Sequence, residues 1–145
     1  MIYIGCDHGG YPLKTALIDY LKENNLEFTD LGCDGETVDY PDIAKKVCPK
    51  VLESEENRGI LICSTGIGIS MTANRIKGIR AALCGDYYSA KYTRKHNDAN
   101  VICFGNHVLG AELAVELLDV FLNTGFDGGR HLPRINKIEI EGEQL

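Results

Sequence analysis

The fold is decided by residues 59–70, which read Gly-Ile-Leu-Ile-Cys-Ser-Thr-Gly-Ile-Gly-Ile-Ser. Residues 59–63 are apolar throughout, which is typical of a strand buried on both faces of a parallel sheet. Gly66 and Gly68 then allow a tight turn and a close backbone approach, and their amides would open a helix. The segment therefore predicts a strand, a turn and a helix N-terminus that can bind an anion.

Similar apolar runs of strand length lie on both sides of this segment, at residues 2–6, 27–31, 79–84 and 101–104. Helical periodicity separates them, most clearly after Pro12, and also at residues 43–52 and 109–122. Pro49 removes a backbone donor and should kink or split the second of these helices. The alternation predicts one α/β domain over residues 1–145: a three-layer, doubly wound (Rossmann-like), parallel five-stranded sheet with helices on both faces.

Composition narrows the class of partner. The chain has 145 residues, a net charge of −6 and a pI near 5.2, which argues against nucleic acid or an anionic membrane as a partner. It has no apolar run long enough to cross a bilayer, so a soluble cytoplasmic protein is expected. None of the six cysteines forms a C-x-C or C-x-x-C pair, which favours free buried thiols over disulfides or structural zinc.

The C-terminal segment differs in character from the rest. A glycine-rich turn at residues 125–129 precedes a polar tail, residues 130–145. Leu132, Ile135 and Ile138 could form a narrow apolar stripe on it. We expect the tail to dock on a partner subunit rather than to fray.

Cys63 stands where chemistry is expected, because ligands bind beyond the carboxyl ends of parallel strands. The helix that Gly66 and Gly68 open would favour the thiolate of Cys63 and offer an oxyanion hole. That combination suits nucleophilic attack or proton abstraction beside a carbonyl. The alternative is that Cys63 is one more buried thiol, and Cys6 competes with it as the reactive one.

Three rival motifs can be tested against this loop. A cysteine phosphatase needs Cys-x5-Arg, but Ile69 occupies the arginine position. A P-loop needs a Gly-Lys-Ser/Thr ending, and no lysine is present. A dinucleotide fingerprint needs a third glycine where Met71 stands, although Asp86 lies where a ribose-binding acid would be. A nucleotide-binding module therefore remains an alternative.

Asp7 and His8 leave the first strand together and could contact a sugar hydroxyl or a phosphate. The alternative is an Asp helix cap beside an exposed histidine. Arg130 and Arg134, spaced i and i+4, could grip a phosphate, or could belong to a solvated basic face. No carboxylate cluster clearly suggests a metal-assisted hydride shift, although Asp7, Asp39, Asp42 and Asp86 leave it open.

His96 and Asn97 lie near the end of the helix after the fourth strand, close to the fifth strand. We expect them to join the site, although a histidine at that position often only compensates the helix dipole. Tyr87, Tyr88 and Tyr92 on the same helix are expected to be packing residues.

These segments, in this order, resemble the family of ribose-5-phosphate isomerase type B and galactose-6-phosphate isomerase. The matching stretches cover nearly the whole chain, and the Cys-Ser-Thr-Gly-Ile-Gly-Ile-Ser and His-Asn-Asp segments are the most specific; they are residues 5–10, 39–41, 59–70, 78–81, 96–101 and 128–131. The Asp-His pair near the start favours the ribose-phosphate branch.

The resemblance implies an aldose-ketose isomerase that interconverts D-ribose 5-phosphate and D-ribulose 5-phosphate through an enediolate. It implies that Cys63 is the base and His96 the acid that opens the furanose ring. It also implies no metal or cofactor, and a homodimer, or a dimer of dimers, whose pockets use both chains. An isomerase of a six-carbon sugar phosphate, such as allose or galactose 6-phosphate, is the alternative.

The remaining site residues follow from the same resemblance. Thr65 joins the catalytic group, Arg130 and Arg134 bind the phosphate, and the sugar is held by Asp7, His8, Tyr40, Ser64, Gly66, Ile67, Gly68, Ser70 and Asn97. His107 belongs to this substrate-binding set too, but members of the family often carry an arginine there. An imidazole in its place could weaken phosphate binding or change which sugar fits.

Overall fold

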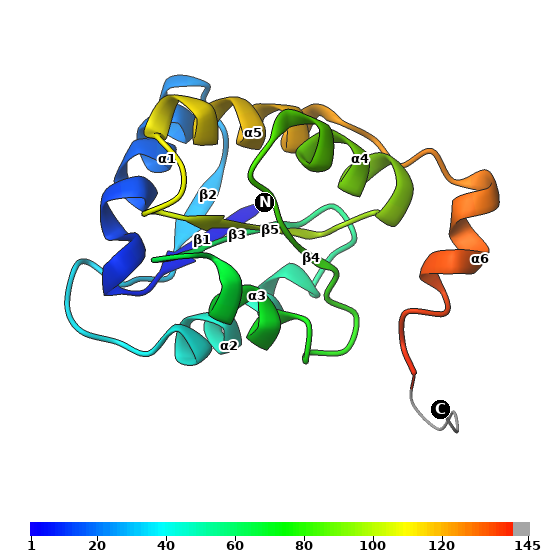
Figure 1. Ribbon diagram of the computed structural model, residues 1–145, viewed down its shortest axis with the longest axis horizontal. Coiled ribbons are helices and arrows are strands. Elements are labelled where there is room, and N and C mark those ends of the chain that lie inside the picture. The colour runs from blue at the N-terminus through cyan, green and yellow to red at the C-terminus, as the bar shows by residue number, and fades with distance from the viewer. Residues whose placement is uncertain (141–145) are drawn as a thin grey trace.

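The computed structural model describes residues 1–140 and arranges them in three layers around a parallel sheet (Figure 1). The strands are β1 (Ile2–Cys6), β2 (Phe28–Asp30), β3 (Arg58–Cys63), β4 (Ala81–Leu83) and β5 (Val101–Gly105), in the order β2-β1-β3-β5-β4. Helices α1 (Tyr11–Glu23), α4 (Tyr87–Asn97) and α5 (Ala111–Asn123) cover one face, and α2 (Tyr40–Val51) and α3 (Ile67–Ala73) cover the other. The doubly wound α/β fold is confirmed.

The central strands are apolar on both faces because both faces are covered. In β3, Ile60 and Ile62 pack with the α1 and α5 layer, whereas Leu61 and Cys63 pack with α2 and α3. All but Cys63 of these four are completely inaccessible to solvent. Full burial of one such aliphatic side chain contributes about 1.5–3 kcal/mol, so the sheet centre is the main source of stability.

Two sequence expectations need correction. The strands at residues 27–31 and 79–84 are shorter, Phe28–Asp30 and Ala81–Leu83. Pro49 does not split α2, which runs without interruption from Tyr40 to Val51. Pro49 lies so near the end of the helix that little of it remains to be disrupted, and the next donor, Leu52 N–H, still reaches the Cys48 carbonyl at 3.2 Å.

The sheet has a topological switch between β1 and β3. The chain leaves β1 toward α1 on one face and leaves β3 toward α3 on the other, so the loops after these neighbouring strands diverge. A crevice at such a point is the usual ligand site of an open α/β sheet. Asp7, His8 and Cys63 all lie there.

The C-terminal segment leaves the sheet and forms two short turns, a 3-10 turn at Gly129–His131 and α6 (Leu132–Ile135), beyond the end of α4 (Figure 1). Leu132 and Ile135 line a cavity of about 450 Å³ against the same chain. Docking of the tail on a partner stays a prediction, and its last residues, 141–145, lie outside the described residues. No helix within residues 1–140 is long and apolar enough to span a membrane.

A buried ion pair ties α1 to the edge strand. The Lys14 ammonium is 1% exposed and contacts Asp30 on β2 at 2.7 Å and Asp34 at 3.5 Å. Burial alone would lower the pKa of Lys14, but the hydrogen bond and charge of Asp30 outweigh it and raise that pKa. Asp30 is therefore the partner that makes a charged lysine tolerable in this interior.

We expect Asp30→Asn to lower the free energy of unfolding by about 2–3 kcal/mol, because it leaves a buried ammonium without its main counter-charge. Urea denaturation followed by circular dichroism measures this change. The matched control is Asp34→Asn, whose carboxylate is 85% exposed and should contribute less than about 0.5 kcal/mol. Equal effects of the two substitutions would contradict this assignment.

Candidate active site

Cys63 ends β3 at the switch point. The Gly66 N–H donates to Cys63 Sγ at 3.0 Å, so a backbone amide points at the sulfur and stabilises negative charge on it. This contact requires Gly66 to adopt φ of +76°, which glycine reaches without steric cost. Cys63 is 4% exposed, the largest value among the six cysteines, so it is enclosed but not completely inaccessible to solvent.

The loop after Cys63 is fixed by close backbone packing. A Cβ on Gly66 would lie 2.5 Å from Leu83 and 2.8 Å from the Phe104 backbone, and one on Gly105 would lie 2.6 Å from the Thr65 backbone. The His107 N–H donates to the Ser64 carbonyl at 2.9 Å. Because β5 supports the loop so closely, the Ser64–Gly68 amides are held in place before any ligand arrives.

Side chains around the loop have distinct environments. Thr65 Oγ1 accepts a hydrogen bond from Ile67 N–H at 3.2 Å and the residue remains exposed. The Ser70 hydroxyl donates to the Ile67 carbonyl at 2.7 Å, so its proton is engaged inside α3. The Tyr40 ring lies over Gly68, where a Cβ would come within 2.7 Å of it. Tyr40 thus covers the start of α3 and is itself 40% exposed.

Asp7 and His8 lie beside this loop. Asp7 Oδ1 accepts from Gly10 N–H at 3.1 Å and caps a 3-10 turn at His8–Gly10, so the capping interpretation holds for one carboxylate oxygen. His8 is exposed, and its Nδ1 lies 3.2 Å from the Val38 carbonyl. A carbonyl only accepts, so Nδ1 carries the proton, and a neutral His8 presents Nε2 as an acceptor.

Four of the other five cysteines, Cys6, Cys48, Cys84 and Cys103, have pKa values that burial raises, so their thiolates are disfavoured. Burial raises the pKa of Cys6 and of Cys48 to about 12, and that of Cys84 to about 11. Burial also raises the pKa of Cys103 well above the ordinary range. All six thiols are free and buried, which confirms that expectation. Cys6, the rival candidate, is therefore held in its protonated form.

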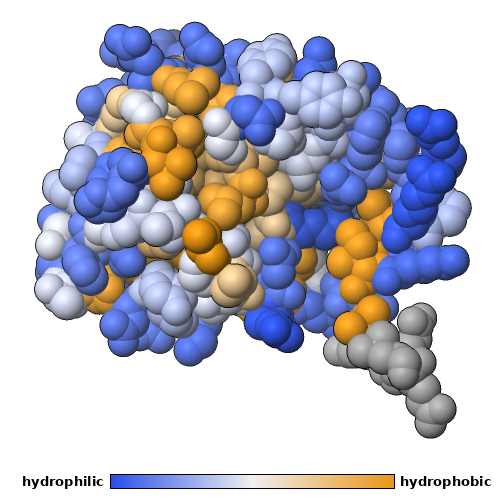
Figure 2. All heavy atoms as spheres, viewed as in Figure 1, coloured by the Kyte–Doolittle hydropathy of each residue, from blue (hydrophilic) through white to orange (hydrophobic). Residues whose placement is uncertain are grey.

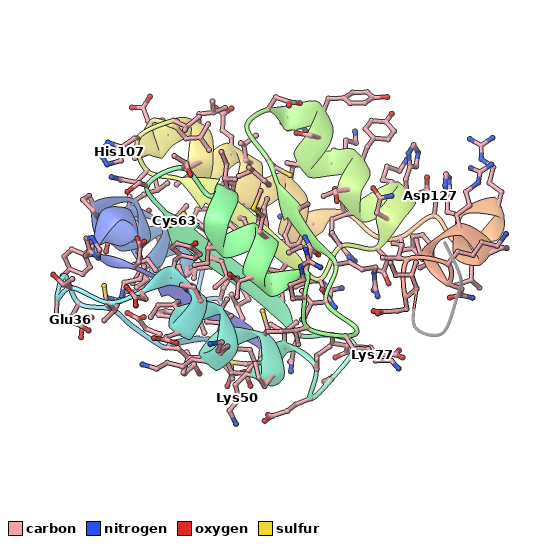
Figure 3. The ribbon with its side chains drawn as sticks, turned by 60° about the horizontal axis from the view of Figure 1, so that its bottom comes forward. Glu36, Lys50, Cys63, Lys77, His107 and Asp127 are labelled. Carbon is pink, nitrogen blue, oxygen red and sulfur yellow. The ribbon has the colours of Figure 1, made fainter. Side chains whose placement is uncertain are left out.

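His96 and Asn97 do not lie beside Cys63, contrary to the expectation that they would share the carboxyl edge. Gly59 pairs with Val101, so β5 begins four residue steps, about 13 Å, before the Cys63 end of β3. α4 ends at Asn97, just before β5, because a helix that follows a parallel strand returns to the amino edge. Figure 3 shows Cys63 and His107 on one side of the molecule and Asp127, near the end of α4, on the other.

A second group of polar side chains therefore gathers at the amino edge. The His96 and His131 rings stack with centroids 4.3 Å apart and an interplanar angle of 14°. Burial lowers the pKa of His131, and the nearby His96, Arg130 and Arg134 lower it further. Sequence reasoning left His131 and Asp127 without a role, because nothing in their spacing shows that the tail returns to α4.

His96, Asp127 and His131 place ligand atoms within 4.8 Å of one another, and two imidazoles with a carboxylate are a set that Zn²⁺ accepts. Lys95 pairs with Asp127 at 3.4 Å, and the positive charges of Arg130 and Arg134 lower the pKa of His131. Three cationic side chains around the cluster oppose a bound dication and suit an anion. Metal-free chemistry stays a prediction.

Asp86, the acidic residue on which the nucleotide-binding interpretation depends, is engaged in hydrogen bonds within the fold. Asp86 caps α4, with Oδ1 accepting from the Ser89 N–H and Oδ2 from the Ser89 hydroxyl, each at 2.8 Å. These bonds lower the pKa of Asp86. Its carboxylate is therefore used inside the fold at the end of the edge strand.

Comparison with known proteins agrees with the motif order. Residues 2–138 match the model of the ribose/galactose isomerase family. The chain belongs to this family. A ribose-5-phosphate isomerase B of Listeria innocua is 52% identical, with 95% of this chain and 94% of that protein covered. The expected aldose-ketose isomerase is thus confirmed at the level of the family.

Two further relatives extend the comparison. A solved ribose 5-phosphate isomerase of Thermotoga maritima superposes with a TM-score of 0.91 at 48% identity, over 94% of this chain and 95% of that one. A D-erythrulose-4-phosphate isomerase of Pectobacterium atrosepticum is 43% identical, over 94% of this chain and 91% of that protein. Members of the ribose/galactose isomerase family therefore carry names that refer to sugars of different chain length.

We expect Cys63 to be the fast-reacting thiol of the native protein. A thiol with a pKa of about 12, such as Cys6 or Cys48, is ionised to about one part in ten thousand at pH 8 and should react only on unfolding. Titration with a chromogenic disulfide should show one fast equivalent, which Cys63→Ser abolishes. A fast equivalent that survives Cys63→Ser would refute the assignment.

Proposed function

We propose that this protein interconverts D-ribose 5-phosphate and D-ribulose 5-phosphate, with Cys63 as the base and His96 as the ring-opening acid. The observation that carries the proposal is the Gly66 N–H aimed at Cys63 Sγ at the switch point of the sheet. It supplies a sulfur whose anion is stabilised and, next to it, backbone amides for an oxyanion. The names of the similar proteins support the same substrate.

The chemistry follows from these groups. His96 gives a proton to the ring oxygen, the ring bond between C1 and that oxygen breaks, and the anomeric hydroxyl loses its proton to solvent, which leaves the free aldehyde. The Cys63 thiolate removes the proton from C2, and the charge moves to O1, where the loop amides and the Thr65 hydroxyl can donate to it. The protonated thiol then returns the proton to C1 while the O2 hydroxyl proton moves to O1, so O2 becomes the ketone oxygen and O1 becomes a hydroxyl. No atom is gained or lost, and the same sulfur serves both carbons.

The separation of the two halves supports a site built from two chains. Cys63 and His96 lie at opposite edges of one sheet, so a substrate that contacts both must lie between copies of the protein, as in a homodimer. Apolar side chains gather over the middle of the face shown in Figure 2. Ile67, Leu83 and Val108 are 45–65% exposed and line one cavity of about 250 Å³ next to Thr65. Burial of this surface would favour association, into a dimer or a dimer of dimers.

In this proposal the phosphate binds to residues at the amino edge of the sheet. Arg130 and Arg134 are exposed beside His131, and each offers a fork of donors that matches a phosphate. His107 lies at the opposite edge, with the Cys63 loop, and in the proposed dimer would approach the partner's arginines. Asp7, His8 and Tyr40 would then hold the sugar hydroxyls near Cys63, with Asn97 from the partner.

Chain length of the sugar is the main alternative, because a six-carbon phosphate needs the same acid, base and anion site. Initial rates with ribose, allose and galactose phosphates, with and without a chelator, decide between them. We expect ribose 5-phosphate to give the highest kcat/KM and the chelator to have no effect. A higher kcat/KM for a hexose phosphate would move the assignment to that sugar.

Cys63→Ala should keep the fold and phosphosugar binding but lower kcat by about 10³-fold or more, because it removes the proposed base. In D₂O the wild-type protein should place deuterium in the product, as observed by NMR. The buried Cys84→Ala is the matched control and should keep its activity. Turnover by Cys63→Ala near the wild-type rate would refute the mechanism.

Mixing two inactive variants tests the shared site. Cys63→Ala and His96→Ala homodimers should each be inactive on ribose 5-phosphate. After subunit exchange of equal amounts, half of the dimers carry one intact site, so about a quarter of wild-type activity should return. Size-exclusion chromatography with light scattering confirms the oligomer. If no activity returns although mixed dimers form, both residues act within one chain and the two-chain site is wrong.

A further inference from the structure

An aromatic ladder runs along α4 and ends at the proposed acid. The Tyr88 and Tyr92 rings stack with centroids 4.2 Å apart and an angle of 23°. Tyr92 meets His96 edge to face at 4.9 Å and 66°, and His96 stacks on His131. Tyr88, Tyr92 and His96 follow one another at intervals of four residues, so they occupy one face of the helix. His96 is thus contacted by an aromatic ring on two sides.

Tyr92 is itself fixed. Besides the stack with Tyr88, its ring lies 5.7 Å from the Lys95 ammonium, and Lys95 in turn pairs with Asp127 at 3.4 Å. Edge-to-face and stacked aromatic pairs stabilise each other beyond the effect of the area that they bury. Such pairs depend on orientation, so a turn of the His96 ring would weaken both of its contacts.

We propose that Tyr92 is a positioning residue for His96: with His131 on the other side, its ring fixes the imidazole in the orientation that delivers a proton to the sugar ring oxygen. This inference rests on the proposed function of His96. A general acid must hold its N–H within hydrogen-bond reach of the atom it protonates, and small misplacements are costly. A freely rotating imidazole on an exposed helix end would meet that requirement only part of the time.

A comparison of two substrates isolates this role. Ribose 5-phosphate must be opened before Cys63 can act. D-erythrose 4-phosphate cannot close a five-membered ring, because the hydroxyl that would attack the aldehyde carries the phosphate. The ring-opening acid is therefore needed for the first sugar and not for the second. The ratio of kcat/KM for the two substrates reports on ring opening alone.

Tyr92→Leu keeps helix propensity and removes the ring. We expect it to lower the ratio of kcat/KM for ribose 5-phosphate to kcat/KM for erythrose 4-phosphate by about tenfold. The circular dichroism spectrum and the oligomeric state should not change. Tyr92→Phe keeps the ring and should restore the ratio to within about twofold of wild type. Tyr87→Leu is the matched control on the same helix, since the Tyr87 ring faces Lys91 and should not affect the ratio.

The outcomes separate this inference from the proposed function. His96→Ala should lower the ratio most, and a wild-type ratio in Tyr92→Leu alongside that loss would overturn the role of Tyr92 alone. Equal losses on both substrates in Tyr92→Leu would show a merely structural effect and also overturn it. If the wild-type protein turns over neither sugar, the proposed function itself fails.

Discussion

The parallel register of the sheet governs where chemistry can occur in this protein. Every strand ends at the same edge, and every connecting helix brings the chain back to the other. Residues that follow strands, such as Cys63 and Asp7, are therefore separated from residues that end helices, such as His96, by the length of the strands. In the proposed mechanism, a substrate that contacts both groups must therefore lie between two chains, so the proposed catalysis requires association.

The loop after β3, at the carboxyl edge of the sheet, packs tightly because glycines there have no side chains to hold the backbone segments apart. Gly66 and Gly105 let the loop after β3 touch β5 directly, and Gly68 admits the Tyr40 ring. The amides near Cys63 therefore need no rearrangement when charge develops on the substrate, which is the condition for efficient electrostatic stabilisation. At the amino edge, rigidity comes instead from stacked rings around His96. The loop at Cys63 is thus held by close backbone packing, whereas His96 is held by side-chain stacking.

The sequence predicted the sheet and its helices well, and placed Cys63 at the end of its strand, because these features depend on local patterns: apolar runs, helical periodicity and glycines after a strand. It failed where distance along the chain and distance in space differ. The short distance in sequence between the end of α4 and β5 predicts the carboxyl edge for His96, but α4 ends next to the amino end of β5. Pro49 does not split α2 because it lies near the helix end, a position that its residue type alone does not reveal. The proximity of His131 and Asp127 to His96 is apparent only in the structure, because it depends on the return of the C-terminal segment to α4.

Charge is divided between the two halves in a way that suits the proposed substrate. A thiolate and a phosphate dianion repel each other, so one pocket wall carrying both would weaken binding and disfavour the ionised sulfur. Here the amide donor that stabilises the Cys63 anion lies at one edge, and Arg130, Arg134 and Lys95 gather at the other. In a site assembled from two chains the sugar spans the gap, with its reacting carbons at the sulfur and its phosphate several bonds away at the arginines. The net charge of −6 is then no obstacle, since the anion meets a local cluster rather than the average field of the protein.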